Sequence, residues 1–136
     1  MKVFISHSHT DTPLAKKVAS ALEESGLDVW NAEREILPGD NWAKKIAEAL
    51  EESDAMVVLL TPEALRSKSV HREIEYALGE KTFNRRLIPV LVGAPENFQA
   101  DSIPWILQRL NMISLPEHDR EEEGIRQITR ALKEVA

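Results

Sequence analysis

The sequence Ala55-Met56-Val57-Val58-Leu59-Leu60 is apolar at every position, and Leu87-Ile88-Pro89-Val90-Leu91-Val92 nearly repeats that pattern. A β-strand has a continuous apolar sequence when both faces of its sheet are covered, because neither row of side chains then meets water. Further apolar runs alternate with amphipathic stretches along the rest of the chain. This alternation favours a parallel sheet with helices packed against it.

The apolar runs predict a doubly wound α/β fold with three layers. The predicted strands are Val3–Ser6, Leu27–Trp30, Ala55–Thr61, Leu87–Val92 and Met112–Leu115. Leu27–Trp30 alternates apolar and polar residues, which indicates a more exposed position in the sheet. With right-handed crossovers, the commonest solution is flavodoxin-like, a five-stranded parallel sheet of order 2-1-3-4-5 with helices on both faces. We predict this fold, although the sequence itself leaves the strand order open.

Helix-capping residues and apolar stripes predict helices between these strands. Thr12-Pro13 is typical of an N-cap and first helical residue, and Gly26 is typical of a helix end. Further helices are predicted to start at Asp40, at Thr61-Pro62, at Ser67 or Ser69, and at about Asp119. The last of these is predicted to reach Val135. A short or irregular helix is predicted from Asp101 to Leu110. The predicted stripe of the helix after Ser67 or Ser69 is Val70, Ile74, Ala77 and Leu78.

Size, composition and charge limit the class of protein. A chain of 136 residues with 43% hydrophobic content suits a single domain over residues 1–136. It has no cysteine, which excludes disulfides and thiolate chemistry and fits a reducing compartment, so we expect a cytoplasmic protein. The net charge of −6 argues against a nucleic-acid partner. No stretch approaches the ~20 apolar residues that span a bilayer, and the N-terminal run is too short for a signal peptide.

The crevice between the first and third predicted strands is the expected ligand site, because open α/β sheets bind ligands where the strand order reverses. The loop from Ser6 to Asp11 enters it, and its hydroxyls and amides suit a phosphate or ribose. Alternatively, these side chains only satisfy the loop's own backbone. His7 and His9 without a third ligand are weak evidence for a metal, and we predict none.

Glu73 is the candidate catalytic carboxylate. Val70 and Ala77, one turn away on either side, lie on the apolar stripe, so Glu73 should lie at the margin of the buried face. Carboxylates beside low-dielectric surface are functionally suggestive. The alternatives are an ion pair with a neighbouring Arg or Lys, or a partly solvated position. Glu75 is flanked by polar residues and should point to water.

Several enzyme classes lack their motifs here. There is no Gly-x-Gly-x-x-Gly or Gly-Lys-Ser/Thr phosphate loop and no Gly-x-Ser-x-Gly elbow. A phosphoryl-accepting receiver domain shares this fold but needs carboxylates at the end of its first strand. Here the first predicted strand ends in Ser6-His7, which argues against that class. The loop Asn31–Asp40 is longer than the other connections, which often indicates function. Trp30 and Trp42 bracket it, and an exposed aromatic side chain there is able to stack on a base, although both are more often core or contact residues.

Five segments resemble a Toll/interleukin-1 receptor (TIR) domain of the bacterial type. In chain order they are Phe4-Ile5-Ser6-His7-Ser8-His9-Thr10-Asp11, Gly26-Leu27-Asp28-Val29-Trp30, Leu37-Pro38-Gly39-Asp40, Val58-Leu59-Leu60-Thr61-Pro62 and Ser67-Lys68-Ser69-Val70-His71-Arg72-Glu73-Ile74. Each segment is weak evidence by itself, but five in order at family-like spacing are strong. The resemblance covers almost the whole chain and implies the flavodoxin-like sheet predicted above.

The resemblance implies an enzyme that cleaves NAD at the nicotinamide–ribose bond, with NAD as substrate and no cofactor. The product would be ADP-ribose or a cyclic or conjugated ADP-ribose signal, in bacterial immune (antiphage) signalling. Glu73 falls on the family's catalytic glutamate. The residues expected to contact the substrate are Ser6, His7, Ser8, His9, Trp30, Leu37 and Ser69.

The resemblance also implies self-association. Asn31–Asp40 matches the family's BB loop, which mediates contacts between TIR domains and often completes a partner's active site. Ser69 stands where relatives often have an aromatic residue, and Ala32 where they commonly have aspartate. Two alternatives therefore stay open. One is a non-catalytic assembly module, and the other is a different nucleoside or nucleotide transferase on the same fold.

Overall fold

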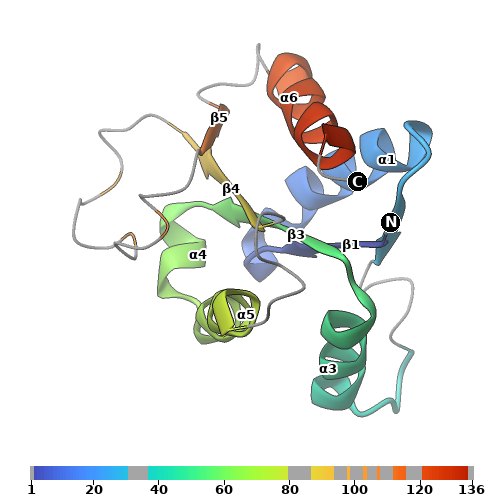
Figure 1. The fold of residues 1–136 in the computed structure, drawn as a ribbon. Helices are drawn as coiled ribbons and strands as arrows, with labels where there is room; N and C mark the ends of the chain where they lie inside the picture. Colours follow the sequence, from blue (N-terminus) through green and yellow to red (C-terminus); the bar gives the residue numbers. More distant parts are fainter. Residues whose placement is uncertain are drawn as a thin grey trace.

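The computed structural model describes residues 2–30, 37–79, 87–93, 98, 103, 107, 112–115 and 121–134. Within these residues, five parallel strands form one sheet in the order β2-β1-β3-β4-β5 (Figure 1). The strands are β1 (Lys2–Ser6), β2 (Asp28–Trp30), β3 (Ala55–Leu60), β4 (Leu87–Val92) and β5 (Ile113–Leu115). The predicted fold and strand order are therefore confirmed. The predicted loop residues 31–36, most of the stretch 101–110 and Val135 lie outside the described residues.

Helices cover both faces of the sheet. They are α1 (Thr12–Glu24), which follows the short 3₁₀ helix η1 (His9–Asp11), α3 (Trp42–Glu52), α4 (Pro62–Arg66), α5 (Lys68–Gly79) and α6 (Glu121–Glu134). Helices α1 and α6 lie side by side on one face, and α3, α4 and α5 lie on the other (Figure 1). Every helix in the described segments is too short or too polar to cross a lipid bilayer.

Each face of the sheet has its own hydrophobic core. Val3 and Ile5 of β1 pack in the core under α1 and α6, whereas Phe4 packs in the core under α3, α4 and α5. Strand side chains alternate between faces, so Ser6 shares the face of Phe4 and points toward the layer that contains α5. All six residues of β3 are buried, as the continuous apolar run predicts.

Helix boundaries differ from the prediction at two caps. Asp11, not Thr12, occupies the N-cap position of α1, because the 3₁₀ turn runs directly into the helix and Thr12 is already helical. Asn41, not Asp40, caps α3, and its Oδ1 accepts from the Lys44 amide at 3.1 Å. Asp40 instead closes the preceding turn, where its Oδ2 accepts from the Leu37 amide at 2.9 Å. Both predicted N-cap positions are wrong by one residue, because at each helix start two residues that favour capping are adjacent in the sequence.

The end of α1 and the stripe of α5 give one confirmation and one correction. Gly26 ends α1 as predicted, with φ +92°. Its amide bonds to the Glu23 carbonyl and the Leu27 amide to the Leu22 carbonyl, each at 3.0 Å, which is the Schellman arrangement. On α5, Leu78 is 40% exposed and so does not belong to the buried stripe. It lies on the far side of that stripe from Glu73, which takes the buried place.

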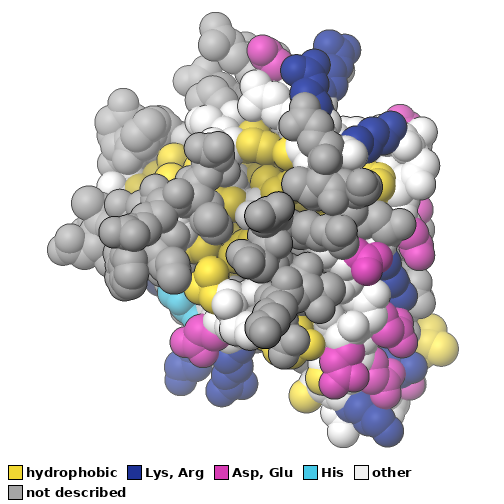
Figure 2. Space-filling model, in the orientation of Figure 1, with side chains coloured by type: hydrophobic (Ala, Val, Ile, Leu, Met, Phe, Trp, Pro, Cys, Tyr) yellow, Lys and Arg dark blue, Asp and Glu magenta, His cyan; other side chains and the backbone are white. Residues whose placement is uncertain are grey.

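The outer face of α3 is solvated. Figure 2 shows acidic and basic side chains gathered over this helix at the lower right, and Lys44, Glu48 and Glu51 are exposed. Its inner face carries Ala49 and Leu50, which are buried. Helix α3 is therefore amphipathic, and its apolar side packs in the core against β1 and β3.

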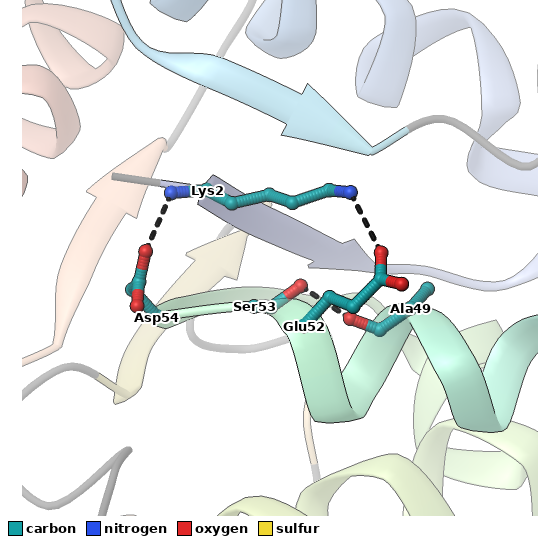
Figure 3. Close-up of polar contacts among 5 residues, drawn as sticks. All are labelled: Lys2, Ala49, Glu52, Ser53 and Asp54. Carbon is teal, nitrogen blue, oxygen red and sulfur yellow. Dashed lines mark hydrogen bonds and ion pairs between the residues drawn. The ribbon is translucent and has the colours of Figure 1, made fainter.

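Contacts at the amino-terminal edge of the sheet align β1 with β3 (Figure 3). The Lys2 amide donates to Asp54 Oδ2 at 2.9 Å, and the Asp54 amide donates to the Lys2 carbonyl at 2.7 Å. Lys2 Nζ reaches Glu52 Oε2 at 3.0 Å, an exposed ion pair that contributes little stability. The two bonds between Lys2 and Asp54 lie next to the first pair of the ladder, Val3 with Ala55, and the same register places Ser6 opposite Val58 at the other edge.

Candidate active site

Buried polar side chains gather at the carboxyl-terminal edge of β1 and β3. Among the described residues, the buried polar or charged residues are Ser6, Ser8, Ser53, Thr61 and Glu73. Ser53 lies at the opposite edge, where its hydroxyl bonds to the Ala49 carbonyl at 2.6 Å (Figure 3). The other four lie on β1, on α5 or in the loops that follow β1 and β3. Burying polar groups is costly unless they are paired, so this concentration marks a candidate site.

Glu73 is more deeply buried than its sequence position predicts, with 7% of its surface exposed. Ser6 Oγ donates to Glu73 Oε1 at 2.7 Å. No described Lys or Arg forms an ion pair with this carboxyl group, which argues against the alternative that Glu73 pairs with a neighbouring Arg or Lys. Burial raises the pKa of Glu73 from 4.5 to about 7, and the Ser6 hydrogen bond opposes that shift only partly. Neutral and ionised forms therefore coexist near pH 7.

The loop after β1 is fastened to the end of β3. Asp11 Oδ2 accepts hydrogen bonds from Ser8 Oγ at 2.7 Å and from Thr61 Oγ1 at 2.5 Å. Because the Ser8 proton is used on Asp11, the 2.9 Å contact between Ser8 Oγ and Thr10 Oγ1 has Thr10 as its donor. The loop also satisfies part of its own backbone, since Asp11 N bonds to the Ser8 carbonyl at 3.0 Å. The alternative that this loop only satisfies its own backbone is therefore correct for some of the loop's polar groups, but not for the Asp11 carboxylate.

Helix α5 is held by the short helix before it. Thr61 Oγ1 accepts from the Ala64 amide at 3.0 Å and so caps α4, as Thr61-Pro62 predicts. Ser67 Oγ accepts from the Val70 amide at 3.3 Å at the start of α5. His71 Nε2 lies 2.6 Å from the Leu65 carbonyl. A carbonyl oxygen only accepts, so Nε2 of His71 carries the proton.

The predicted substrate-contacting residues differ in their surroundings. Ser6 and Ser8 are buried, and His7 is half-buried with its Nδ1 3.3 Å from the Ile5 carbonyl. His9 and Ser69 are exposed, although Ser69 lies one turn before Glu73 on α5. Among the described hydrogen bonds, only that of Ser6 joins any of these residues directly to Glu73. Their roles in binding stay predictions.

Trp30 and Leu37 lie on the segments that flank residues 31–36 of the long loop. Trp30 is half-buried, and its ring stacks on Phe4 with centroids 5.4 Å apart and planes 13° apart. Since Phe4 precedes Ser6 on the same face of β1, Trp30 extends the apolar wall beside the site. Leu37 is 63% exposed, so in the isolated chain it presents its side chain to solvent.

The sequence did not predict the hydrogen-bond partners in the site, which include Asp11 with Thr61, Asp11 with Ser8, and His71 with Leu65. One of them carried a detectable signal. The predicted strand order places the ends of the first and third strands side by side, so a carboxylate after one and a hydroxyl after the other were able to meet. The sequence suggested local partners instead, namely the backbone of its own loop for Asp11 and the start of the next helix for Thr61.

A groove of about 670 Å³ lies elsewhere, between α1 and α6. Its lining residues are Ala21, Glu24, Ser25, Ile125, Arg126, Thr129, Arg130 and Lys133. The sheet separates this groove from Glu73, because α1 and α6 cover the opposite face from α5 (Figure 1). We therefore locate the candidate site from the buried polar groups, and not from this groove.

Comparisons with known proteins agree with the fold. A family model described as TIR domain matches residues 3–129. The Stimulator of interferon genes protein of Magallana gigas is 28% identical over 125 residues, which are 90% of this chain. The chain spans only 29% of that relative's length.

Two solved structures are similar over nearly the whole chain. A metazoan TIR-STING receptor from C. gigas, solved in complex with 2′,3′-cGAMP, has 27% identity and a TM-score of 0.73. The match covers 93% of this chain and 39% of that receptor chain. The TIR domain of the Toll-related receptor TRR-2 from Hydra magnipapillata has 19% identity and a TM-score of 0.74, over 96% of this chain and 97% of its own. That second likeness shows the fold.

Proposed function

The chain belongs to the TIR domain family, and from this premise we propose that it cleaves the nicotinamide–ribose bond of NAD. The observation that carries the proposal is Glu73, a buried carboxyl group without a described cationic partner, hydrogen-bonded to Ser6 at the end of β1. In sheets of this strand order, ligands bind at the carboxyl ends of β1 and β3, which is where Ser6 holds Glu73. Stability gives no reason to bury a carboxylate in this way, whereas catalysis does.

One carboxylate suffices for this reaction. The nicotinamide ring of NAD is already cationic, so it leaves with the bonding electron pair as a neutral molecule, and no acid has to protonate it. Positive charge then develops on ribose C1′ and the ring oxygen. The ionised Glu73 carboxylate stabilises this oxocarbenium-like centre.

Ser6 and the loop that follows it complete the proposed site. Ser6 holds Oε1 of Glu73, which leaves Oε2 to accept hydrogen bonds from ribose hydroxyls. The loop from His7 to Asp11 supplies hydroxyls and amides to the ribose and phosphates. Water that adds to C1′ and loses a proton gives ADP-ribose, whereas an internal nucleophile gives a cyclic product. We place this chemistry in cytoplasmic immune signalling, with antiphage defence as its setting.

The test is chromatography of NAD after incubation with the protein at high concentration. We expect nicotinamide to appear together with one adenine-containing co-product, whose identity distinguishes hydrolysis, cyclisation and transfer. Consumption of other nucleotides, with NAD left intact, would favour a different transferase on this fold. The absence of any nucleotide turnover would favour the assembly module described next.

A non-catalytic assembly module is the second candidate, and Leu37 favours it. The Asp40 amide bonds to the Leu37 carbonyl at 3.0 Å, and Gly39 has φ +92°, so Pro38-Gly39 forms the centre of a tight turn. This turn presents a 63% exposed leucine at the end of the Asn31–Asp40 loop. Under this function Leu37→Ala weakens self-association in analytical ultracentrifugation, whereas Leu78→Ala, at an exposed leucine of α5, does not. Equal association of both variants would contradict it.

A further inference from the structure

Asp11 occupies the N-cap position of α1, yet its side chain makes no capping hydrogen bond. Aspartate is favoured at this position because its carboxylate usually accepts from amides of the helix that it precedes. Here Oδ2 instead accepts from Ser8 and Thr61. Thr61 lies 50 residues away in the sequence, so the carboxylate joins its own loop to a distant segment of the chain.

The bond between Asp11 and Thr61 closes a circuit of hydrogen bonds around Glu73. Its members, in order, are Ser6, Glu73, His71, Leu65, Thr61, Asp11 and Ser8. Helix α5 connects Glu73 to His71, and the short loop after β1 connects Ser8 back to Ser6. Without Asp11, the loop after β1 and the start of α4 lose the hydrogen bonds that link them directly.

We propose that Asp11 is a positioning residue that fixes Glu73 for the NAD cleavage proposed above, on which this catalytic role rests. Asp11 acts through the two loops that border the carboxyl group, and not by touching the substrate. Its 2.5 Å and 2.7 Å hydrogen bonds have the lengths of hydroxyls that donate to a carboxylate. Short bonds from two segments to one oxygen hold those segments at a fixed separation and keep water away from Glu73.

Two substitutions at Asp11 separate its hydrogen bonds from its charge. Asp11→Ala removes the acceptor that joins Ser8 to Thr61. Asp11→Asn removes the same charge but keeps an oxygen that is able to accept from both hydroxyls. Neither change removes a helix cap, because Asp11 does not cap α1 and Thr61 still caps α4.

The first readout does not depend on catalysis. Carbon-13 NMR titration of the Glu73 carboxyl group, assigned by comparison with Glu73→Gln, measures its pKa in each folded protein. We expect about 7 in the wild type and in Asp11→Asn, and a fall toward 4.5 in Asp11→Ala as water reaches the carboxyl group. If Asp11→Ala does not fold, Ser8→Ala removes one of the two bonds and should show part of the same fall.

The second readout is the rate of nicotinamide release. We expect Asp11→Ala to lower kcat about tenfold or more while KM changes less than about threefold, because a displaced carboxylate loses transition-state stabilisation but little binding. Asp11→Asn should recover most of the rate. An Asp11→Ala protein with unchanged kcat and an unchanged Glu73 titration overturns the proposal, as does an Asp11→Asn protein that shifts as far as Asp11→Ala.

The two readouts also separate this proposal from the proposed function. A wild-type protein that releases no nicotinamide contradicts NAD cleavage, whatever Asp11 does. The NMR titration then still decides whether Asp11 positions the carboxyl group, since it needs no substrate.

Discussion

At Glu73, burial and one hydrogen bond act on the same carboxyl group in opposite directions. Burial is the larger effect and raises the pKa to about 7, while the bond from Ser6 favours the ionised form. The sequence predicted that this carboxyl group lies beside apolar neighbours. It did not predict the depth of burial, because that depends on how α5 packs against β1, which helical spacing does not specify.

The first residue-scale prediction concerns the pH dependence of catalysis. Ionised Glu73 is the active form, so kcat/KM should rise with pH and level off above about 7, which is the pKa of Glu73 in the protein without substrate. The corresponding rise in kcat should lie at lower pH, because bound cationic nicotinamide favours the ionised carboxylate. Rates measured from about pH 5 to pH 8 check this. A kcat/KM that does not change across that range would contradict it.

The second concerns stability. The folded pKa of Glu73 lies above its ordinary 4.5, so between 4.5 and about 7 the folded protein binds more protons than the unfolded chain. Stability from this group is therefore fully present below pH 4.5 and is lost as pH rises through 7. Glu73→Gln removes this loss and should be more stable than wild type by up to about 3 kcal/mol at pH 8, and nearly equal at pH 4.

Denaturant unfolding at both pH values measures this difference. Glu75→Gln is the matched control, because Glu75 lies two residues further along α5 and is exposed. If Glu73→Gln is no more stable than Glu75→Gln at pH 8, burial does not destabilise the ionised Glu73 carboxyl group, and the raised pKa is contradicted.

At the scale of elements, the strands were predictable and the helix caps were less so. Residues 55–60 are apolar at every position and are all buried, and residues 87–90 of the second run are buried as well, whereas Leu91 and Val92 at its end are half-buried. Caps depend on which of two adjacent polar residues turns toward the helix. The Asp11 side chain bonds to Thr61 and does not cap α1, and Thr61 comes within reach only once β1 and β3 pair in the sheet.

The packing of α6 on β5 gives an element-scale prediction. A Cβ added at Gly124 would lie 1.7 Å from Leu115 Cδ2 and 3.0 Å from its Cγ, and Leu115 is only 3% exposed. Gly124→Ala should therefore destabilise the protein by about 1–2 kcal/mol, since overpacking outweighs the gain in helix propensity. Gly79→Ala, which meets nothing within 4 Å, should be neutral or slightly stabilising. Thermal unfolding of both variants checks this, and equal melting temperatures would contradict it.

At the scale of the whole molecule, the strand order 2-1-3-4-5 brings the two loops of the site together. This convergence was predicted from the alternation of apolar runs, because parallel strands share one carboxyl edge. The circuit through Asp11 was not predictable, since it joins loops whose conformations depend on each other. The contribution of Asn31–Asp40 to assembly stays a prediction.

The exposed Leu37 and the family resemblance predict that activity depends on association. If the Asn31–Asp40 loop of one copy completes the site of another, the rate per protein molecule should rise with protein concentration. A dilution series of nicotinamide release measures this rise, and Leu37→Ala should flatten it. A specific rate that stays constant over a wide range of concentration would contradict a shared site.

Nicotinamide release from NAD by wild type, Glu73→Gln and Glu75→Gln, at one high protein concentration, shows whether Glu73 is the catalytic carboxylate. We expect release by wild type and Glu75→Gln, and a rate at least about 100-fold lower for Glu73→Gln, because an amide cannot stabilise the ribosyl cation. Release by Glu73→Gln at the rate of the wild type would contradict the assignment of Glu73 as the catalytic carboxylate.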